Sequence, residues 1–106
     1  MKTPKEVKKI IEAPDFPVAY RAWREGEAPP LPYGVYYAGR ANNFGADGKV
    51  YYTAQRYTIE MYTEEKDPAV EKALEERLDA AGIFWTKDET YIESEHMNEI
   101  IYEIEV

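Results

Sequence analysis

The chain has 106 residues, the usual size of a single domain, with 21 acidic and 13 basic side chains and a formal net charge of −8. Cysteine is absent, which excludes a disulfide framework and cysteine-ligated zinc. The acidic balance argues against binding duplex nucleic acid through its phosphates, and no run of about 18 apolar residues predicts a membrane span. We therefore expect one soluble, intracellular domain over residues 1–106.

The first third of the chain predicts one short helix and two strands. Residues 4–12 (PKEVKKIIE) have capping residues at the start and prolines beyond the end, as a helix requires. Residues 18–23 and 33–38 alternate as strands, and a proline-rich segment between them predicts an extended connection. Gly34 interrupts one face of the second strand, which indicates either a bulge or a close backbone neighbour.

Residues 39–49 (GRANNFGADGK) predict a long loop, because glycine, asparagine and aspartate tolerate tight turns. Asp47 and Gly48 are placed to turn the chain into the next strand. Phe44 lies in the middle of this loop, and two interpretations stay open for it. It either forms a contact site for another molecule or folds back to seal the edge of the core.

A long strand at residues 50–62 and an amphipathic helix form the predicted scaffold. The strand alternates, with one face predicted to be buried, and Asp67, Pro68 and Gly82 mark the two ends of the helix. The predicted buried positions are Tyr57, Ile59 and Met61 on the strand and Val70, Leu74, Leu78 and Ala81 on the helix. We expect these two apolar surfaces to pack together.

The last quarter of the chain is predicted to form further β-strands. Residues 83–94 predict a hairpin or one bent strand broken at residues 87–89, and residues 100–106 predict a final strand with an acidic outer face. The expected order is therefore α-β-β-β-α-β-β. This order predicts an α+β fold, a two-layer sandwich with helices packed on one face of a mostly antiparallel sheet.

No catalytic, cofactor or metal site is predicted. His96 is the only histidine, and although Ser94 would share its face on a strand, the neighbouring Glu93 and Glu95 would point away. The acidic clusters lack the spacing of known calcium or zinc motifs. We expect a protein that is not an enzyme and needs no cofactor.

Over roughly residues 6–106, the chain resembles small phage and prophage proteins from the head–tail module of long-tailed phages of Gram-positive bacteria. The phrases PPLPYGVYY and IESEHMNEIIYEIE carry the likeness, and the layout is similar to that of tail-terminator, or tail-to-head joining, proteins. The resemblance implies an α+β subunit without enzymatic activity that assembles as a ring, commonly a hexamer, on the tail tube. It also implies tail-tube or head-connector partners, and a location in the host cytoplasm during assembly and in the virion tail afterwards.

On this interpretation, DNA passes through the ring without binding to the acidic protein. The predicted subunit or tube contacts come from the loop and from tyrosines on outward sheet faces. They are Arg40, Asn42, Asn43 and Phe44, together with Tyr36 and Tyr52. Two alternatives stay open: a small acidic binding or inhibitory domain, of the antitoxin or DNA-mimic type, and a ligand-binding domain with a concave aromatic pocket.

Overall fold

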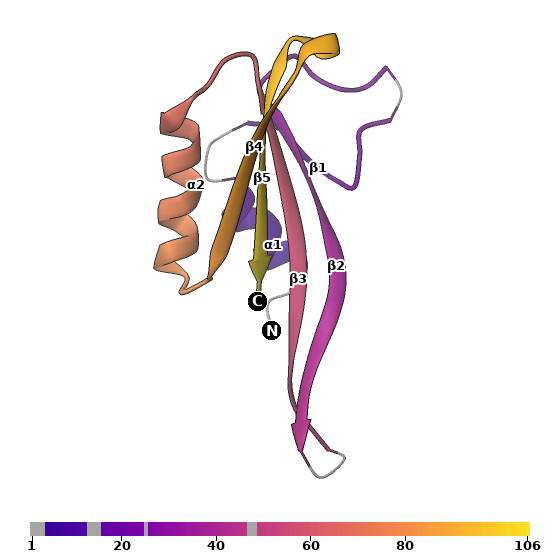
Figure 1. Ribbon diagram of the computed structural model, residues 1–106. Coiled ribbons are helices and arrows are strands. Elements are labelled where there is room, and N and C mark those ends of the chain that lie inside the picture. Colours follow the sequence, from indigo (N-terminus) through magenta and orange to yellow (C-terminus); the bar gives the residue numbers. More distant parts are fainter. Residues whose placement is uncertain (1–3, 13–15, 25, 47–48) are drawn as a thin grey trace.

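The computed structural model describes the backbone of residues 4–12, 16–24, 26–46 and 49–106, and their side chains apart from those of residues 4, 40–46 and 49–54 (Figure 1). The predicted order of elements is confirmed. The elements are α1 (Pro4–Ile11), β1 (Val18–Tyr20), β2 (Tyr33–Ala46), β3 (Lys49–Thr63), α2 (Pro68–Ala80), β4 (Trp85–Ile92), the short 3-10 helix η1 (Glu93–Glu95) and β5 (Met97–Glu105).

In the described part of the chain, five strands form one sheet in the order β1-β2-β3-β5-β4. Only β1 pairs in parallel, with β2, and the other three pairings are antiparallel. The last strand lies between β3 and β4, because α2 carries the chain across to the sheet edge before β4 and β5 return as a hairpin (Figure 1). The expected mostly antiparallel sheet is confirmed.

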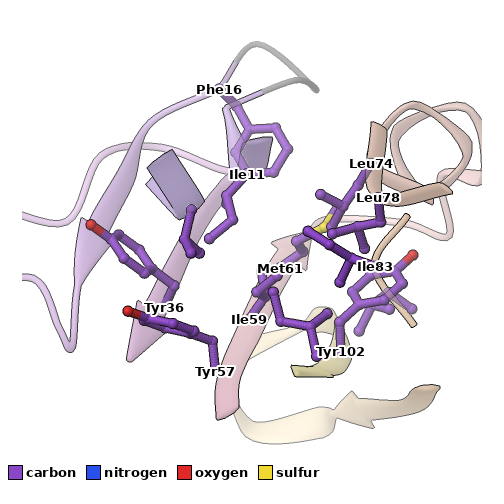
Figure 2. Close-up of a cluster of buried hydrophobic side chains, with 13 residues drawn as sticks. Ile11, Phe16, Tyr36, Tyr57, Ile59, Met61, Leu74, Leu78, Ile83 and Tyr102 are labelled. Atoms are coloured by element: carbon purple, nitrogen blue, oxygen red, sulfur yellow. The ribbon is translucent and has the colours of Figure 1, made fainter. Parts of the chain in front are cut away.

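Both helices pack on one face of this sheet. Val7 and Ile11 of α1 and Leu74 and Leu78 of α2 are fully buried and belong to the same hydrophobic cluster (Figure 2). The alternation predicted for β3 holds there, since its three apolar positions are buried. The sheet residues of the cluster are Tyr36, Tyr57, Ile59, Met61, Ile100, Tyr102 and Ile104.

Helix α2 has the predicted ends and a different buried stripe. The Oδ1 atom of Asp67 accepts a hydrogen bond from the backbone N–H of Val70 at 3.3 Å, and Gly82 has a left-handed φ of +70° after the helix. Ala81 was expected in the buried stripe but is exposed, because the helix ends one residue before it. Glu71 is buried instead, one helical turn before Leu74.

The first strand is shorter than predicted. It ends at Tyr20 because Arg21 takes a left-handed φ of 71°, which breaks the extended backbone. The close-neighbour interpretation of Gly34 is confirmed. A Cβ atom there would lie 3.1 Å from the carbonyl oxygen of Glu60 and 3.2 Å from the ring of Phe16, so Phe16 reaches the core over this glycine.

The C-terminal strands differ from the prediction: β4 is one continuous strand, so a hairpin within residues 83–94 is wrong, and β5 is longer than the predicted final strand. Residues 87–89 lie inside β4 and do not break it, since each pairs with β5. β5 begins at Met97, three residues before the predicted start, because Met97 pairs with Ile92 across the turn. His96 closes that turn with a left-handed φ of 50°.

Candidate interaction surfaces

The predicted loop at residues 39–49 is wrong for most of its length. β2 continues to Ala46 and β3 begins at Lys49, so this stretch is the far end of a hairpin. Its inward-facing backbone groups pair across the hairpin, which keeps the chain extended there. The expected turn at Asp47 and Gly48 lies outside the described residues.

Residues 39–46 and 49–54 form a projecting element, here called the arm. Beyond the base of the arm, the described parts of β2 and β3 pair only with each other. The pairing of β1 with β2 ends at Tyr36, and the pairing of β5 with β3 ends at Arg56. Six residues of strand extend about 20 Å. The arm therefore accounts for much of the elongation of the molecule, whose extents are 51 × 29 × 23 Å, and it points away from both helices (Figure 1).

The base of the arm contains an irregularity held by Gln55. The strand register shifts between Ala38 and Ala41, and the Gln55 side-chain amide donates hydrogen bonds to the carbonyl oxygens of Gly39 at 2.7 Å and Arg56 at 3.0 Å. Gln55 also exchanges two backbone hydrogen bonds with Val106, at 2.8 and 2.9 Å. Val106, directly after β5, thus helps to fix the point at which the arm leaves the sheet.

Five of the six predicted contact residues belong to the arm. Arg40 falls within the register shift, and Phe44 is directly opposite Tyr52 across the hairpin. Asn42 and Asn43 occupy successive positions on β2. Their side chains lie outside the described part, so both interpretations of Phe44 stay predictions.

The sixth predicted contact residue, Tyr36, is not on an outward face. Only 5% of it is exposed, and its ring meets that of Tyr20 edge-on at a centroid distance of 5.0 Å. It pairs with Ile59, so it shares the face that the helices cover (Figure 2). Burial, followed by the charge of Tyr20, raises the pKa of Tyr36. The prediction was wrong because alternation identifies two faces without saying which one meets the helices.

The opposite sheet face, here called the open face, has neither α1 nor α2 packed on it. The strand registers bring together a mixture of acids, tyrosines and small apolar or hydroxyl side chains at its positions. They are Tyr33, Val35, Tyr37, Arg56, Thr58, Glu60, Tyr62, Thr86, Asp88, Thr90, Ile92, Met97, Glu99, Ile101, Glu103 and Glu105.

Glu60 and Glu99 occupy the centre of the open face. The Glu60 carboxylate accepts hydrogen bonds from the hydroxyls of Tyr37 at 3.5 Å and Tyr62 at 3.3 Å, and Glu99 is 9% exposed. Burial, followed by the charge of Glu99, raises the pKa of Glu60. Burial, followed by a hydrogen bond with Glu99, raises the pKa of Tyr62. Two carboxylates therefore share a partly dehydrated, tyrosine-lined site.

Replacing Glu60 with glutamine is expected to increase the free energy of unfolding at pH 7. The amide can keep the tyrosine contacts but carries no charge beside Glu99. Because the folded-state pKa of Glu60 is raised, its ionisation weakens the folded state at neutral pH, and this penalty vanishes below the unfolded pKa of about 4.3. In urea titrations, the advantage of Glu60→Gln over wild type should shrink as the pH falls from 7 to 4.

The exposed Glu103 on the same face supplies the control for this experiment. Glu103→Gln should change the free energy of unfolding by less than about 0.5 kcal/mol at either pH. A loss of stability in Glu60→Gln at pH 7 would contradict the assignment of a raised pKa.

The described residues contain no group of three or more histidine, aspartate or glutamate side chains placed to hold a metal ion. Ser94 belongs to η1 and His96 follows it in a left-handed conformation, so the two do not share a strand face. Both are exposed. A shallow hollow on the open face is lined by Thr86, Lys87, Asp88, Ile101 and Glu103.

The fold and these surfaces define a small α+β domain with a projecting β-hairpin. A scan against models of protein families finds no match to the chain, and a search of curated proteins finds no match either. Across the described ranges, neither helix is long and apolar enough to cross a membrane. The resemblance to phage head–tail proteins therefore stays a prediction.

The acidic, tyrosine-lined site on the open face was not predicted from the sequence, although part of the pattern that indicates it was present. Glu60 and Tyr62 alternate with the buried Ile59 and Met61. Glu99 fell outside the predicted final strand, so its proximity to Glu60 could not be inferred. The pairing of Tyr62 with Glu99 depends on β5 inserting between β3 and β4.

Proposed function

We propose that this chain is a non-enzymatic structural protein of a phage or prophage. It acts as a tail terminator or head–tail joining component that assembles as a ring at the end of the tail tube. The arm is the observation that carries this proposal, together with the resemblance in sequence. A two-stranded extension that leaves the sheet by about 20 Å suits a subunit that reaches its neighbours.

The physical argument rests on the instability of such an extension when it stands alone. A two-stranded hairpin without a third strand or a helix is only marginally stable in water. Its outer edges also present unpaired N–H and C=O groups that invite other chains. Contacts with neighbouring subunits or with the tube would cover these groups, so the arm is better explained by assembly than by a solitary protein.

A second candidate function is an acidic inhibitory domain that mimics nucleic acid. The acids on the open face favour it. The arm does not fit it, because residues 39–54 contain two bases and one acid. The genes beside this one distinguish the candidates: portal, capsid and tail-tube genes support assembly, and a toxin gene supports inhibition.

The test is to remove the arm while keeping the sheet. Replacing residues 42–54 with Asn-Gly closes the hairpin on the pair Ala41 and Gln55 with a two-residue turn. Gln55, which holds the base, is retained. In the phage that encodes the protein, this variant is expected to remain folded and to leave heads and tails unjoined, with infectious particles falling by at least about a hundredfold.

Lys72→Ala serves as the control, because Lys72 is exposed on α2 and forms only a surface ion pair with Glu76. It should give wild-type numbers of particles. Circular dichroism and cooperative thermal unfolding establish that the armless variant is folded. Wild-type particle numbers from a folded armless variant would show that the proposed function is wrong.

A further inference from the structure

The arm and the rest of the chain have opposite formal charge. Residues 39–54 contain Arg40, Lys49 and Asp47 as their charged residues, a net charge of +1. The remaining residues contain eleven bases and twenty acids, a net charge of −9. A basic projection on a strongly acidic molecule favours an acidic partner surface.

The open face is such a surface. Its positions carry an excess of acids over bases: Glu60, Asp88, Glu99, Glu103 and Glu105 against Arg56, which forms an ion pair with Glu105. Tyrosines and apolar side chains lie among them, with Val35 buried and Ile101 half-buried. Aromatic groups with flanking charges are typical of protein interfaces, and the arm sequence also contains Phe44, Tyr51 and Tyr52.

The arm of a chain cannot bind its own open face. It continues β2 and β3 beyond the sheet, and it points away from the part of the sheet where β3, β5 and β4 lie together (Figure 1). The hydrogen bonds of Gln55 to Gly39 and Val106 hold the base of the arm in line with the strands. The complementary acidic surface must therefore come from another molecule, and a second copy of the chain carries one.

We propose that the arm of one copy docks on the open face of a second copy, across β5 and β4. The hollow lined by Thr86, Lys87, Asp88, Ile101 and Glu103 lies on this part of the face. The Lys87 ammonium is itself paired with Glu71 and Glu75 of α2. Two different surfaces meet in such a contact, so it is a head-to-tail interface, which closes into a ring when the rotation permits. This inference rests on the proposed function and specifies how neighbouring subunits recognise each other.

The test reverses charge on each surface of the full chain. One variant carries Arg40→Glu with Lys49→Glu, and the other carries Asp88→Lys with Glu103→Lys. Self-association is measured by sedimentation over a range of concentrations in low salt. Each variant alone should raise the dissociation constant by at least about tenfold, and an equimolar mixture should recover association. Added salt should weaken wild-type association.

Matched controls carry the same change in net charge on other surfaces. Lys5→Glu with Lys72→Glu matches the arm variant, and Glu64→Lys with Glu76→Lys matches the face variant; all four side chains are exposed. Both controls should associate as wild type does. Since Asp88 and Glu103 are also exposed, melting temperatures should stay close to wild type.

Three outcomes would overturn the inference: a wild-type chain that stays monomeric at every concentration, charge variants that associate normally, or a mixture that does not recover. The last outcome is expected if arms pair with arms, or if the arm binds a different acidic protein. The proposed function is judged separately by the armless variant in the phage. If the armless variant blocks head–tail joining while the charge variants associate normally, the proposed function in assembly is supported. Only the proposal that the arm docks on the open face is then wrong.

Discussion

Leu74→Ala is expected to lower the free energy of unfolding by about 2 to 5 kcal/mol. Leu74 is fully buried on α2 and belongs to the cluster that joins both helices to the sheet (Figure 2). Removing three carbon atoms loses their burial and leaves a cavity that rigid neighbours fill only in part. Urea unfolding followed by circular dichroism should show a lower midpoint with an unchanged slope.

The expected loss is large because a domain of this size has only about 5 to 15 kcal/mol of stability. Arg77→Ala is the control on the same helix: Arg77 is exposed, and its replacement should change the free energy of unfolding by less than about 0.5 kcal/mol. A loss below about 1 kcal/mol in Leu74→Ala would mean that α2 does not pack on the sheet as described.

The second large effect is expected from Lys66→Met combined with Lys87→Met. Glu71 has only 5% of its side chain exposed, and the Nζ atoms of these lysines lie 2.7 and 2.9 Å from its two oxygens. Its Oε2 has no hydrogen bond of good geometry, so the ion pair with Lys66 is its compensation. Without both cations, a buried carboxylate stays uncompensated, which costs about 3 to 5 kcal/mol.

A triple variant separates this cause from lost packing. Adding Glu71→Leu to the two lysine replacements removes the uncompensated charge and should recover most of the lost free energy of unfolding, because an apolar side chain can replace a buried ion pair. Chemical unfolding at pH 7 measures both variants. If the triple variant is no more stable than the double variant, the buried charge is not the cause.

The same lysine cluster links α2 to the last two strands. Lys87 lies 2.7 Å from Oε2 of Glu75, which also accepts a hydrogen bond from the hydroxyl of Tyr102 at 2.6 Å. Burial alone would raise the pKa of Glu75, but these two hydrogen bonds outweigh it and lower the pKa. The hydrogen bond with Glu75 raises the pKa of Lys87.

Local patterns predicted the scaffold well, for physical reasons. The cap at Asp67 and the stop at Gly82 depend on neighbours within one helical turn, so sequence alone contains them. The buried face of β3 follows from its period of two. The order of the elements and their mostly antiparallel pairing follow from such local signals.

The arm, the placement of Tyr36 and the burial of Glu71 depend instead on which distant segments pack together. The arm was predicted as a loop because its glycines and asparagines suit turns, but pairing with the opposite strand makes the same residues extended. Tyr36 was placed outward because alternation does not say which face the helices cover. Glu71 lies in a helix stripe that was expected to be apolar. It can be buried there because Lys66 and Lys87, both outside the helix, neutralise its charge.

The sequence by itself determined the elements, their order, the caps of α2 and the apolar face of β3, because these are set by residues a few positions apart. Only the tertiary structure decided that residues 39–46 and 49–54 project as an arm and that Glu60 and Glu99 share the open face. Both depend on β5 pairing with β3 as far as Glu105, which lies opposite Arg56. This pairing joins distant segments, and no local pattern encodes its register.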